Sequence, residues 1–545
     1  MDSQIYESIH PDFHVPPDLS LSQLLQKYNP EDVPETKVIL EGISPGGRQV
    51  TYGELRNEAA TMAAYFTTVL GLSTGDTVAI YAPNSVQYPI LAHSVMWFGG
   101  VIAGMNALTS VQDLVHYLKI SRPSAVITNH ALRMKMEEAV SRVKDVDSMV
   151  LDLDELFTNM SLKGLPPCAP FDLSGKDNRQ CPASIMFSSG TSGKPKAVIW
   201  SHYSIIAHVL QPRITLPEQN SCLEREVVYA PLCHMLGFIG AVLKPAFLGC
   251  YAVILERFHY ETYIQACAKA RVTIMKMIPA TAVAIAKDRS IEQHDLSNVR
   301  HILCTGATLQ AQIVRRLQEI MKSCAIIQSY GLSEIGVSIL KGARSSEKSG
   351  SVGRLFPGNK LRIVDEKLQD VPTGHAGEAL VRGPTLFMEY KNDLASTQEA
   401  FHKGWFRTGD ILSMDSDGFL WFHDRQKEMI KYKGNLVAPA ELENLLAAHG
   451  DVLEAAVCGY FDESQQTDIP VGYVKLRDSV AFSDRDHLLE KIKKSVDDVV
   501  SSPKKLRGGL FYLAELPKNA TGKIMRAHLP ARLVSDARKK RASKI

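Results

Sequence analysis

The sequence lacks the features that would tie it to a disulfide framework, a metal cluster, nucleic acid or a membrane. Its nine cysteines form no C-x-x-C pair and no metal-ligand spacing, which is typical of reduced thiols in an intracellular protein. The formal net charge is only +2, so no strong field favours nucleic acid or an anionic membrane. The polar, proline-bearing start of the chain, residues 1–17, does not have the pattern of a secretory signal.

Long apolar runs are also missing. The most apolar stretch, residues 238–255, is interrupted by Lys244 and Pro245, and we therefore expect buried helix and strand there. With 45% hydrophobic and 22% charged residues the composition is that of an average globular protein. A length of 545 residues exceeds one ordinary core and predicts one large domain plus a smaller one.

Helical and extended patterns alternate through most of the chain, which is typical of an α/β fold. Thr51 and Glu54 match a capping box and predict a helix that begins at Thr51. The buried face of this helix is predicted to consist of Leu55, Ala59, Met62, Phe66 and Val69. Short apolar runs predict strands at residues 77–81, 125–128 and 301–304.

The last part of the chain is predicted to form a separate α+β domain. Apolar runs predict strands at residues 452–460, 469–476 and 510–516. A helix is expected to begin at Ser483 and to bury Leu488, Leu489, Ile492, Val496 and Val499. The polar stretch 424–429 is the expected junction, which divides the chain into residues 1–424 and 425–545.

The first chemical signal is a loop rich in Ser, Thr and Gly. It reads Ser188-Ser189-Gly190-Thr191-Ser192-Gly193-Lys194-Pro195-Lys196. Its glycines allow tight turns that bring amide N–H groups toward an anion, and its last lysine adds a charge suited to phosphate. The order G-x-x-x-x-G-K-[ST] of a Walker loop is absent, and the β-branched Val198 and Ile199 predict that a strand follows.

Further segments carry polar groups in short, distinctive strings. They are Pro231–His234, Gln328–Glu334, Gly404–Asp410, Asp424–Arg425, Lys431–Gly434 and Pro517–Arg526. Each alone has an ordinary structural reading, such as a turn, a core histidine or an exposed lysine. Together, and in this order, they resemble the acyl- and aryl-adenylating (AMP-binding) superfamily over nearly the whole chain. Within it the sequence is most similar to 4-coumarate–CoA ligase-like acyl-CoA synthetases.

The resemblance implies a fold and an activity. We expect a large multi-sheet N-terminal adenylating domain and a small α+β C-terminal domain joined by a hinge at Lys427. The implied enzyme uses ATP, Mg²⁺ and coenzyme A. It would convert an acid into acyl-AMP with release of pyrophosphate and then transfer the acyl group to coenzyme A. Alternatives are an adenylation enzyme that loads a carrier protein, a luciferase-like oxygenase, and a non-catalytic nucleotide-binding protein.

The resemblance also implies roles for individual residues. Tyr330 would lie on the adenine, Ser333 would contact the α-phosphate, and Asp410 would accept hydrogen bonds from the ribose. The implied catalytic residues are Lys196, His234, Glu334 and Lys523, with Glu334 also binding Mg²⁺. The implied nucleotide-binding set is Ser188, Ser189, Gly190, Thr191, Ser192, Gly193, Lys196, Gly306, Ala307, Ser329, Tyr330, Ser333, Asp410, Arg425, Lys431 and Lys523.

The acid pocket is assigned only by position in the family pattern. Its candidates are His234, Met235, Phe238, Ile278, Gly306, Ala307, Ser329, Val337 and Ser338. This set is largely apolar and contains no buried cation and no carboxylate. It therefore favours a hydrophobic or aryl monocarboxylic acid over an amino acid.

Departures from the family pattern occur at two positions. Ala197 stands where the family usually has glycine, which is a small change. Leu436 stands where several plant-type ligases have a glutamine, so that contact must be absent or replaced, with Asn435 as a candidate.

The C-terminal Ser543-Lys544-Ile545 nearly matches the peroxisomal Ser-Lys-Leu address. It predicts a peroxisomal protein that binds an import receptor, or otherwise a cytoplasmic one.

Overall fold

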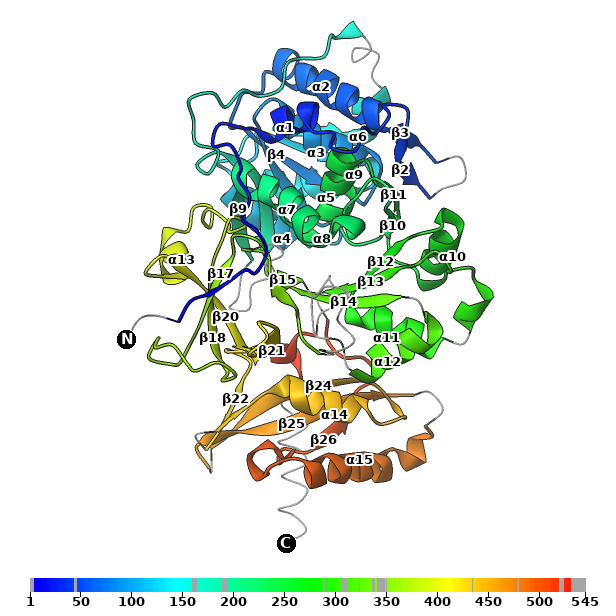
Figure 1. Cartoon of the computed structure of the whole chain (residues 1–545), viewed down its shortest axis with the longest axis vertical. Coiled ribbons are helices and arrows are strands. Elements are labelled where there is room, and N and C mark those ends of the chain that lie inside the picture. The colour runs from blue at the N-terminus through cyan, green and yellow to red at the C-terminus, as the bar shows by residue number, and fades with distance from the viewer. Residues whose placement is uncertain are drawn as a thin grey trace.

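We analysed a computed structural model of the chain. It describes residues 4–43, 47–158, 164–188, 195–288, 290–305, 309, 311–322, 324–335, 339–340, 348, 350–433, 435–463, 465–477, 480–518 and 524–530. Figure 1 shows a large multi-sheet α/β part and, below it, a smaller C-terminal part coloured orange and red. The predicted fold class, a large N-terminal domain with a small C-terminal α+β domain, is confirmed.

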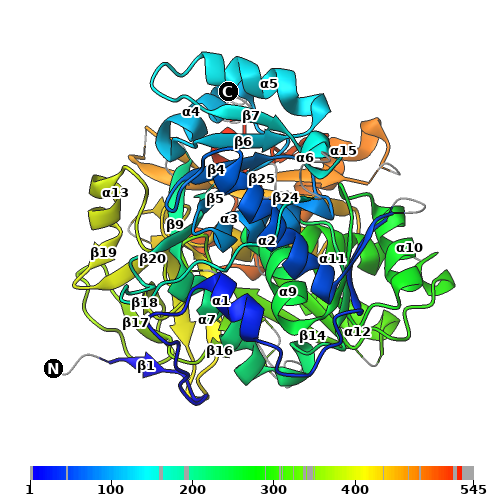
Figure 2. The same cartoon turned by 90° about the horizontal axis from the view of Figure 1, so that it is seen from above.

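The first sheet of the large domain is six-stranded in the order β7-β6-β4-β5-β8-β9, with only the β8–β9 pair antiparallel. Its strands are β4 (Thr77–Tyr81), β5 (Val101–Met105), β6 (Ala125–Thr128), β7 (Met149–Asp152), β8 (Pro182–Ser188) and β9 (Lys196–Ser201). Helices α2 (Tyr52–Thr68) and α3 (Gln87–Trp97) cover one face, and α4 (Val111–Ser121) and α5 (His130–Ser141) cover the other (Figure 2). Two-sided coverage explains why the strands are continuously apolar.

The second and third sheets hold the walls of the candidate site. The second has the order β10-β11-β2-β3, from β2 (Val38–Gly42), β3 (Gln49–Thr51), β10 (Arg225–Val228) and β11 (Tyr251–Ile254). The third has the order β12-β13-β14-β15-β16, from β12 (Ile274–Met277), β13 (His301–Thr305), β14 (Ala325–Tyr330), β15 (Ile339–Leu340) and β16 (Arg354–Leu355). Because β12, β13 and β14 are parallel, their carboxyl ends meet at one edge.

Further helices surround these sheets. They are α1 (Leu21–Lys27), α6 (Leu153–Thr158), α7 (His202–Thr215), α8 (Met235–Gly237), α9 (Lys244–Leu248), α10 (Tyr260–Ala270), α11 (Pro279–Lys287) and α12 (Ala311–Ile320). Residues 238–243 form a π-helical turn between α8 and α9, and β11 follows, so the apolar stretch 238–255 is buried helix and strand as predicted. No helix within the described ranges has both the length and the apolar composition needed to cross a membrane.

An antiparallel sheet leads to the C-terminal domain. It contains β1 (Tyr6–Glu7), β17 (Lys360–Val364), β18 (Gly377–Arg382), β19 (Phe401–His402), β20 (Trp405–Met414) and β21 (Leu420–Arg425), with α13 (Leu394–Glu399) beside it. After β21 the chain makes a turn at residues 426–428 and enters the C-terminal domain. That domain contains β22 (Ile430–Tyr432), β23 (Asn435–Val437), α14 (Pro439–Ala447), β24 (Val452–Asp462), β25 (Thr467–Leu476), α15 (Arg485–Val499) and β26 (Leu510–Tyr512), around a core of its own.

The local predictions hold in the element interiors and fail at some ends. The capping box of Thr51 and Glu54 is present and begins α2, but Val69 lies just after the helix and is 53% exposed. The C-terminal helix begins at Arg485 after a short 3₁₀ turn, and its last residue, Val499, is 69% exposed. Both valines fit the helical spacing, but at a helix end the chain turns away from the core. The last strand ends at Tyr512, earlier than predicted.

Candidate active site

A cavity of about 1680 Å³ lies between the large domain and the C-terminal domain. The carboxyl ends of β12, β13 and β14 form part of its wall, and β20, β21 and α14 form another part. Sites at the carboxyl edge of parallel strands, and between domains, are where small molecules usually bind in α/β proteins. We therefore take this cavity as the candidate active site.

A buried carboxylate, that of Asp410, marks one side of the cavity. Asp410 lies on β20 opposite Arg425 of β21, and its side chain is 3% exposed. The Tyr330 hydroxyl at the end of β14 donates to Asp410 Oδ2 at 2.6 Å, and Arg425 Nε is 3.6 Å from Asp410 Oδ1. Burial and the neighbouring Asp410 raise the pKa of Tyr330, so its hydroxyl stays a donor at neutral pH. These three side chains come from separate sequence motifs and meet around one buried carboxylate, in what we call the nucleotide corner.

Glu334 follows the cavity residue Ser333 in the sequence and forms a second polar group with Tyr390 and Lys196. The Tyr390 hydroxyl donates to Glu334 Oε1 at 2.8 Å, and Lys196 Nζ lies 4.5 Å from the centre of the Tyr390 ring. Burial raises the pKa of Glu334, although Tyr390 and nearby cations partly oppose this. Glu334 and Lys196 are therefore close together, while Ser333 is held by its carbonyl, which accepts from Trp200 Nε1 at 3.0 Å.

The phosphate loop joins strands β8 and β9. Ser188, the last residue of β8, pairs with Lys196, the first residue of β9, so both ends of the loop are fixed. Ala197, where the family usually has glycine, is buried in β9 opposite Phe187 and keeps the strand pairing. Residues 189–194 lie outside the described residues.

The expected acid pocket is only partly brought together. His234, Met235, Ile278 and Ser329 line the cavity. Phe238 does not: it is 2% exposed and packs in the main core of the large domain. Burial lowers the pKa of His234 to about 4, so its imidazole is neutral at neutral pH, and its Nε2 lies 3.3 Å from the Asn106 amide.

The cavity also has a polar wall that the sequence did not indicate. His208, Gln219, Lys244 and Lys276 line it, and all four are buried. The expectation of a pocket without a buried cation is therefore wrong for the cavity as a whole. The sequence did contain a sign of buried cations, because Lys244 interrupts an apolar stretch and Lys276 interrupts an apolar strand. Only the tertiary fold shows that both reach the same cavity.

The C-terminal domain contributes an ion-pair network to the cavity wall. Arg526 donates from Nε to Glu443 Oε1 at 2.8 Å and from Nη2 to Glu443 Oε2 at 2.7 Å, and it pairs with Glu428 in the turn after β21. Asp424 Oδ2 accepts the Ala440 N–H at 2.9 Å, which ties β21 to the start of α14. Sequence reasoning missed Glu428 and Glu443, because carboxylates on an amphipathic helix or in a turn resemble a solvated surface.

The remaining predicted residues lie in several places. Lys427 is exposed in the turn at residues 426–428, and Lys431 is exposed on β22 and does not line the cavity. Leu436 pairs with Lys431 in the β22–β23 hairpin, and the Asn435 amide donates to carbonyls of its own turn.

Other predicted residues fall outside the described part of the chain. They are Gly306, Ala307, Val337, Ser338, Lys523 and the terminal Ser543-Lys544-Ile545. Lys518 and Ile524, on either side of the segment with Lys523, line the cavity. Within the described residues no group of three or more His, Cys, Asp or Glu side chains could hold a metal ion.

Comparison with known proteins gives consistent matches along the chain. Residues 28–391 match the family model described as AMP-binding enzyme, and residues 441–523 match the AMP-binding enzyme C-terminal domain. The chain is 29% identical over 541 residues to 4-coumarate–CoA ligase-like 9 of Arabidopsis thaliana, covering 96% of this chain and 94% of that protein. It is 29% identical over 495 residues to peroxisomal OPC-8:0-CoA ligase 1 of the same plant, covering 89% and 88%.

Solved structures show the same fold at low identity. ATP-bound MatB from Rhodopseudomonas palustris superposes with a TM-score of 0.84 at 21% identity, covering 95% of this chain and 100% of that one. The anthranilate CoA ligase AuaEII in complex with anthranoyl-AMP superposes with a TM-score of 0.82 at 23% identity, covering 97% and 99%.

Proposed function

Because the chain belongs to the AMP-binding enzyme family, we propose that it is an ATP-dependent acid–CoA ligase. It activates a carboxylic acid as acyl-AMP, releases pyrophosphate, and transfers the acyl group to coenzyme A. The observation that carries this proposal is the corner of Tyr330, Asp410 and Arg425, in which a buried carboxylate faces the cavity beside an aromatic ring. Such a corner suits a nucleoside, because a carboxylate can accept two ribose hydroxyls side by side.

The acid and the triphosphate are both anions, so the first step requires charge neutralisation and alignment. Lys196 holds the leaving phosphates together with the loop at residues 188–194. Lys523 is proposed to act on the α-phosphate and the carboxylate, and the position of Lys518 and Ile524 on the cavity wall supports this role. The neutral imidazole of His234 borders the bound carboxyl group without adding a charge that would compete for it.

Magnesium fits the group around Glu334. A single carboxylate near a phosphate-binding loop is a usual Mg²⁺ site, in which phosphate oxygens and water complete the coordination. Bound there, Mg²⁺ would neutralise charge on the phosphates. Tyr390 orients the Glu334 carboxylate, and Lys196 shares the same neighbourhood.

Coenzyme A is the proposed acceptor. The cavity lining includes the exposed cations Arg257, Lys287 and Arg477, a basic set that suits a ligand with several phosphates. Two of the proteins named above carry CoA ligase names and a third a CoA ligase-like name, which favours coenzyme A over a carrier protein or an oxygenase reaction. In the second step the C-terminal domain is proposed to turn about Lys427 and to withdraw Lys523.

The body of the acid is proposed to be largely apolar or aryl. The lining residues Met235, Ile239, Ile278 and Leu332 support this. A peroxisomal location is proposed on the terminal Ser543-Lys544-Ile545, supported by one relative with a peroxisomal name. Deletion of those three residues should move a fluorescent fusion from peroxisomes to the cytosol.

The partial reactions test these roles directly. Lys523→Ala should abolish acyl-AMP formation, measured as acid-dependent pyrophosphate release, and should spare thioester formation from supplied acyl-AMP. Lys494→Ala, an exposed lysine on α15, is the control and should leave both reactions unchanged. Equal loss of both reactions in Lys523→Ala would contradict the assigned role.

A further inference from the structure

The polar wall of the cavity comprises His208 of α7, Gln219 of a short 3₁₀ turn, Lys244 of α9 and Lys276 of β12. Lys244 is separated from His234 by α8 and the π-helical turn of residues 238–243, so the two lie at different places along the cavity lining. The exposed fractions of these four residues are only 3–8%. Polar groups buried this deeply are normally satisfied by the protein itself.

Two of these side chains are not satisfied by the protein. Gln219 Nε2 and His208 Nε2 are buried and have no hydrogen-bond partner among the described residues. Burial lowers the pKa of His208 to about 3, so this ring is neutral and adds no charge. A buried polar atom without a partner is unfavourable, and its presence in a residue that lines a cavity indicates a partner that the protein does not supply.

The lysines give this wall a surplus of donors. Lys276 is paired with Glu226 at 2.7 Å, which accounts for both charges. Lys244 Nζ donates to the main-chain carbonyl of Gln219 at 3.1 Å and forms no ion pair with a carboxylate of the described residues. The nearby Glu224 is already bound by Arg300 at 3.0 Å and by Thr273 at 2.7 Å. The Lys244 ammonium thus lacks a carboxylate partner and the Gln219 amide N–H lacks any partner among the described residues.

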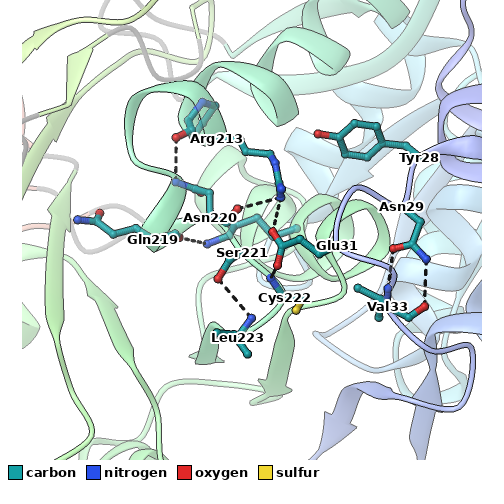
Figure 3. A network of polar contacts seen from close by, with 12 residues as sticks. Tyr28, Asn29, Glu31, Val33, Arg213, Gln219, Asn220, Ser221, Cys222 and Leu223 are labelled. Carbon is teal, nitrogen blue, oxygen red and sulfur yellow. Dashed lines mark hydrogen bonds and ion pairs between the residues drawn. The ribbon is translucent and has the colours of Figure 1, made fainter.

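The position of Gln219 is fixed by a network on its other side. Glu31 accepts from Arg213 Nη1 at 2.5 Å and from the Cys222 N–H at 2.9 Å, and the Asn220 amide donates to the carbonyls of Pro212 and Leu216. Figure 3 shows the Gln219 side chain extending away from this network. The backbone of Gln219 is therefore held in place, while its amide nitrogen has no partner among the described residues, which suits a binding residue with a fixed support.

We propose that this wall binds an oxygen acceptor at the far end of the acid, so that the substrate is a carboxylic acid with a distal carbonyl or carboxylate oxygen. The inference rests on the proposed function, since it assumes that the reacting carboxyl group lies near His234. Gln219 Nε2 and Lys244 Nζ would donate to the distal oxygen, while the apolar lining contacts the chain between the two ends. Acids that lack the distal oxygen leave these donors unpaired, and such sites discriminate strongly.

A matched set of straight-chain acids tests the inference. Acid-dependent pyrophosphate release is measured for octanoic, 7-oxooctanoic and octanedioic acid, and for the corresponding ten-carbon acids. We expect the wild-type kcat/KM for an oxo acid or a diacid to exceed that for the plain acid of the same length by at least about tenfold. The oxo acid and the diacid together distinguish a neutral acceptor from an anionic one.

Variants connect the preference to the wall. Gln219→Met keeps the side-chain volume and removes a donor that has no protein partner, so folding should be unaffected and the preference should fall about three- to tenfold. Lys244→Met should reduce it further, most of all for the diacid. Gln398→Met, the same change at an exposed site on α13, should leave the preference and the rate unchanged.

The possible failures can be told apart. Equal or faster release with octanoic and decanoic acid, or an unchanged preference in Gln219→Met, would overturn this inference and leave the proposed function intact. No release with any acid would overturn the proposed function and this inference with it.

Discussion

Arg526 connects the turn at residues 426–428 to α14, and its replacement by methionine tests whether this connection supports the proposed first half-reaction. The guanidinium makes two short hydrogen bonds to Glu443 and an ion pair with Glu428. Burial alone would lower the pKa of Arg526, but the Glu443 and Glu428 carboxylates more than offset this and raise it. Methionine fills a similar volume and removes the charge and all these bonds.

The expected cost follows from what is left behind. The Arg526, Glu443 and Glu428 side chains are only 17%, 14% and 21% exposed, so removal of the cation leaves two poorly solvated carboxylates. Breaking a fully buried pair costs about 3–5 kcal/mol, and the partial exposure here reduces this to about 2–3 kcal/mol. If that energy holds the C-terminal domain in the described pose, acyl-AMP formation should fall by about 30- to 150-fold.

The assay compares the two half-reactions. Arg526→Met should slow acyl-AMP formation, followed as acid-dependent pyrophosphate release, far more than thioester formation from supplied acyl-AMP. Arg507→Met is the control and should leave both rates unchanged. Arg507 is exposed, its side-chain hydrogen bonds within the described residues go to Ser502 in its own turn, and it forms no ion pair there, although it lies 5.1 Å from the centre of the Tyr432 ring. An equal fall in both reactions would refute the reasoning, since it would indicate general loss of the folded domain.

Three further results are expected. Asp410→Asn should raise the KM for ATP by about 10- to 100-fold with little effect on the KM for the acid, because only the charge-assisted ribose acceptor is weakened. A larger effect on the KM for the acid, measured by steady-state kinetics, would contradict the nucleotide-binding role of Asp410. Activity should fall on acidification at a higher pH than an ordinary glutamate predicts, because burial raises the pKa of Glu334 and only its carboxylate form binds Mg²⁺. Excess Mg²⁺ should shift the acidic side of the pH profile of kcat/KM to lower pH. If the profile does not change with the Mg²⁺ concentration, Glu334 is not a Mg²⁺ ligand. Lys287→Glu should raise the KM for coenzyme A about tenfold, with a salt dependence weaker than in the wild type, and an unchanged KM would remove Lys287 from the acceptor site.

The sequence predicts those parts of the site that lie in fixed strings. Tyr330, Asp410 and Arg425 could be assigned because each stands in a distinctive motif, and the structure places them in contact. The strands at residues 77–81 and 125–128 were predictable because a sheet covered on both faces requires continuous apolar runs.

The sequence does not predict which way a side chain points when a helix is apolar all round. Phe238 was expected in the pocket and lies in the core, because Lys244 is the one polar side chain among residues 235–248 and a single residue does not define the rotation of the helix. Lys244 and Lys276 were not expected in the cavity, since they come from different elements and meet only through the tertiary fold. The predicted burial of Val69 and Val499 was wrong for a related reason: the apolar spacing continues in the sequence to a position where the chain leaves the core, just after α2 and at the last residue of α15.

The central claim is that one cavity activates an acid with ATP and passes it to coenzyme A. The most direct measurement is pyrophosphate release across a panel of carboxylic acids, with and without coenzyme A, with thioester quantified in parallel. We predict release that depends on the acid, and a thioester that forms only when coenzyme A is present. Release without a thioester would contradict coenzyme A as the acceptor, and no release with any acid would contradict the ligase assignment itself.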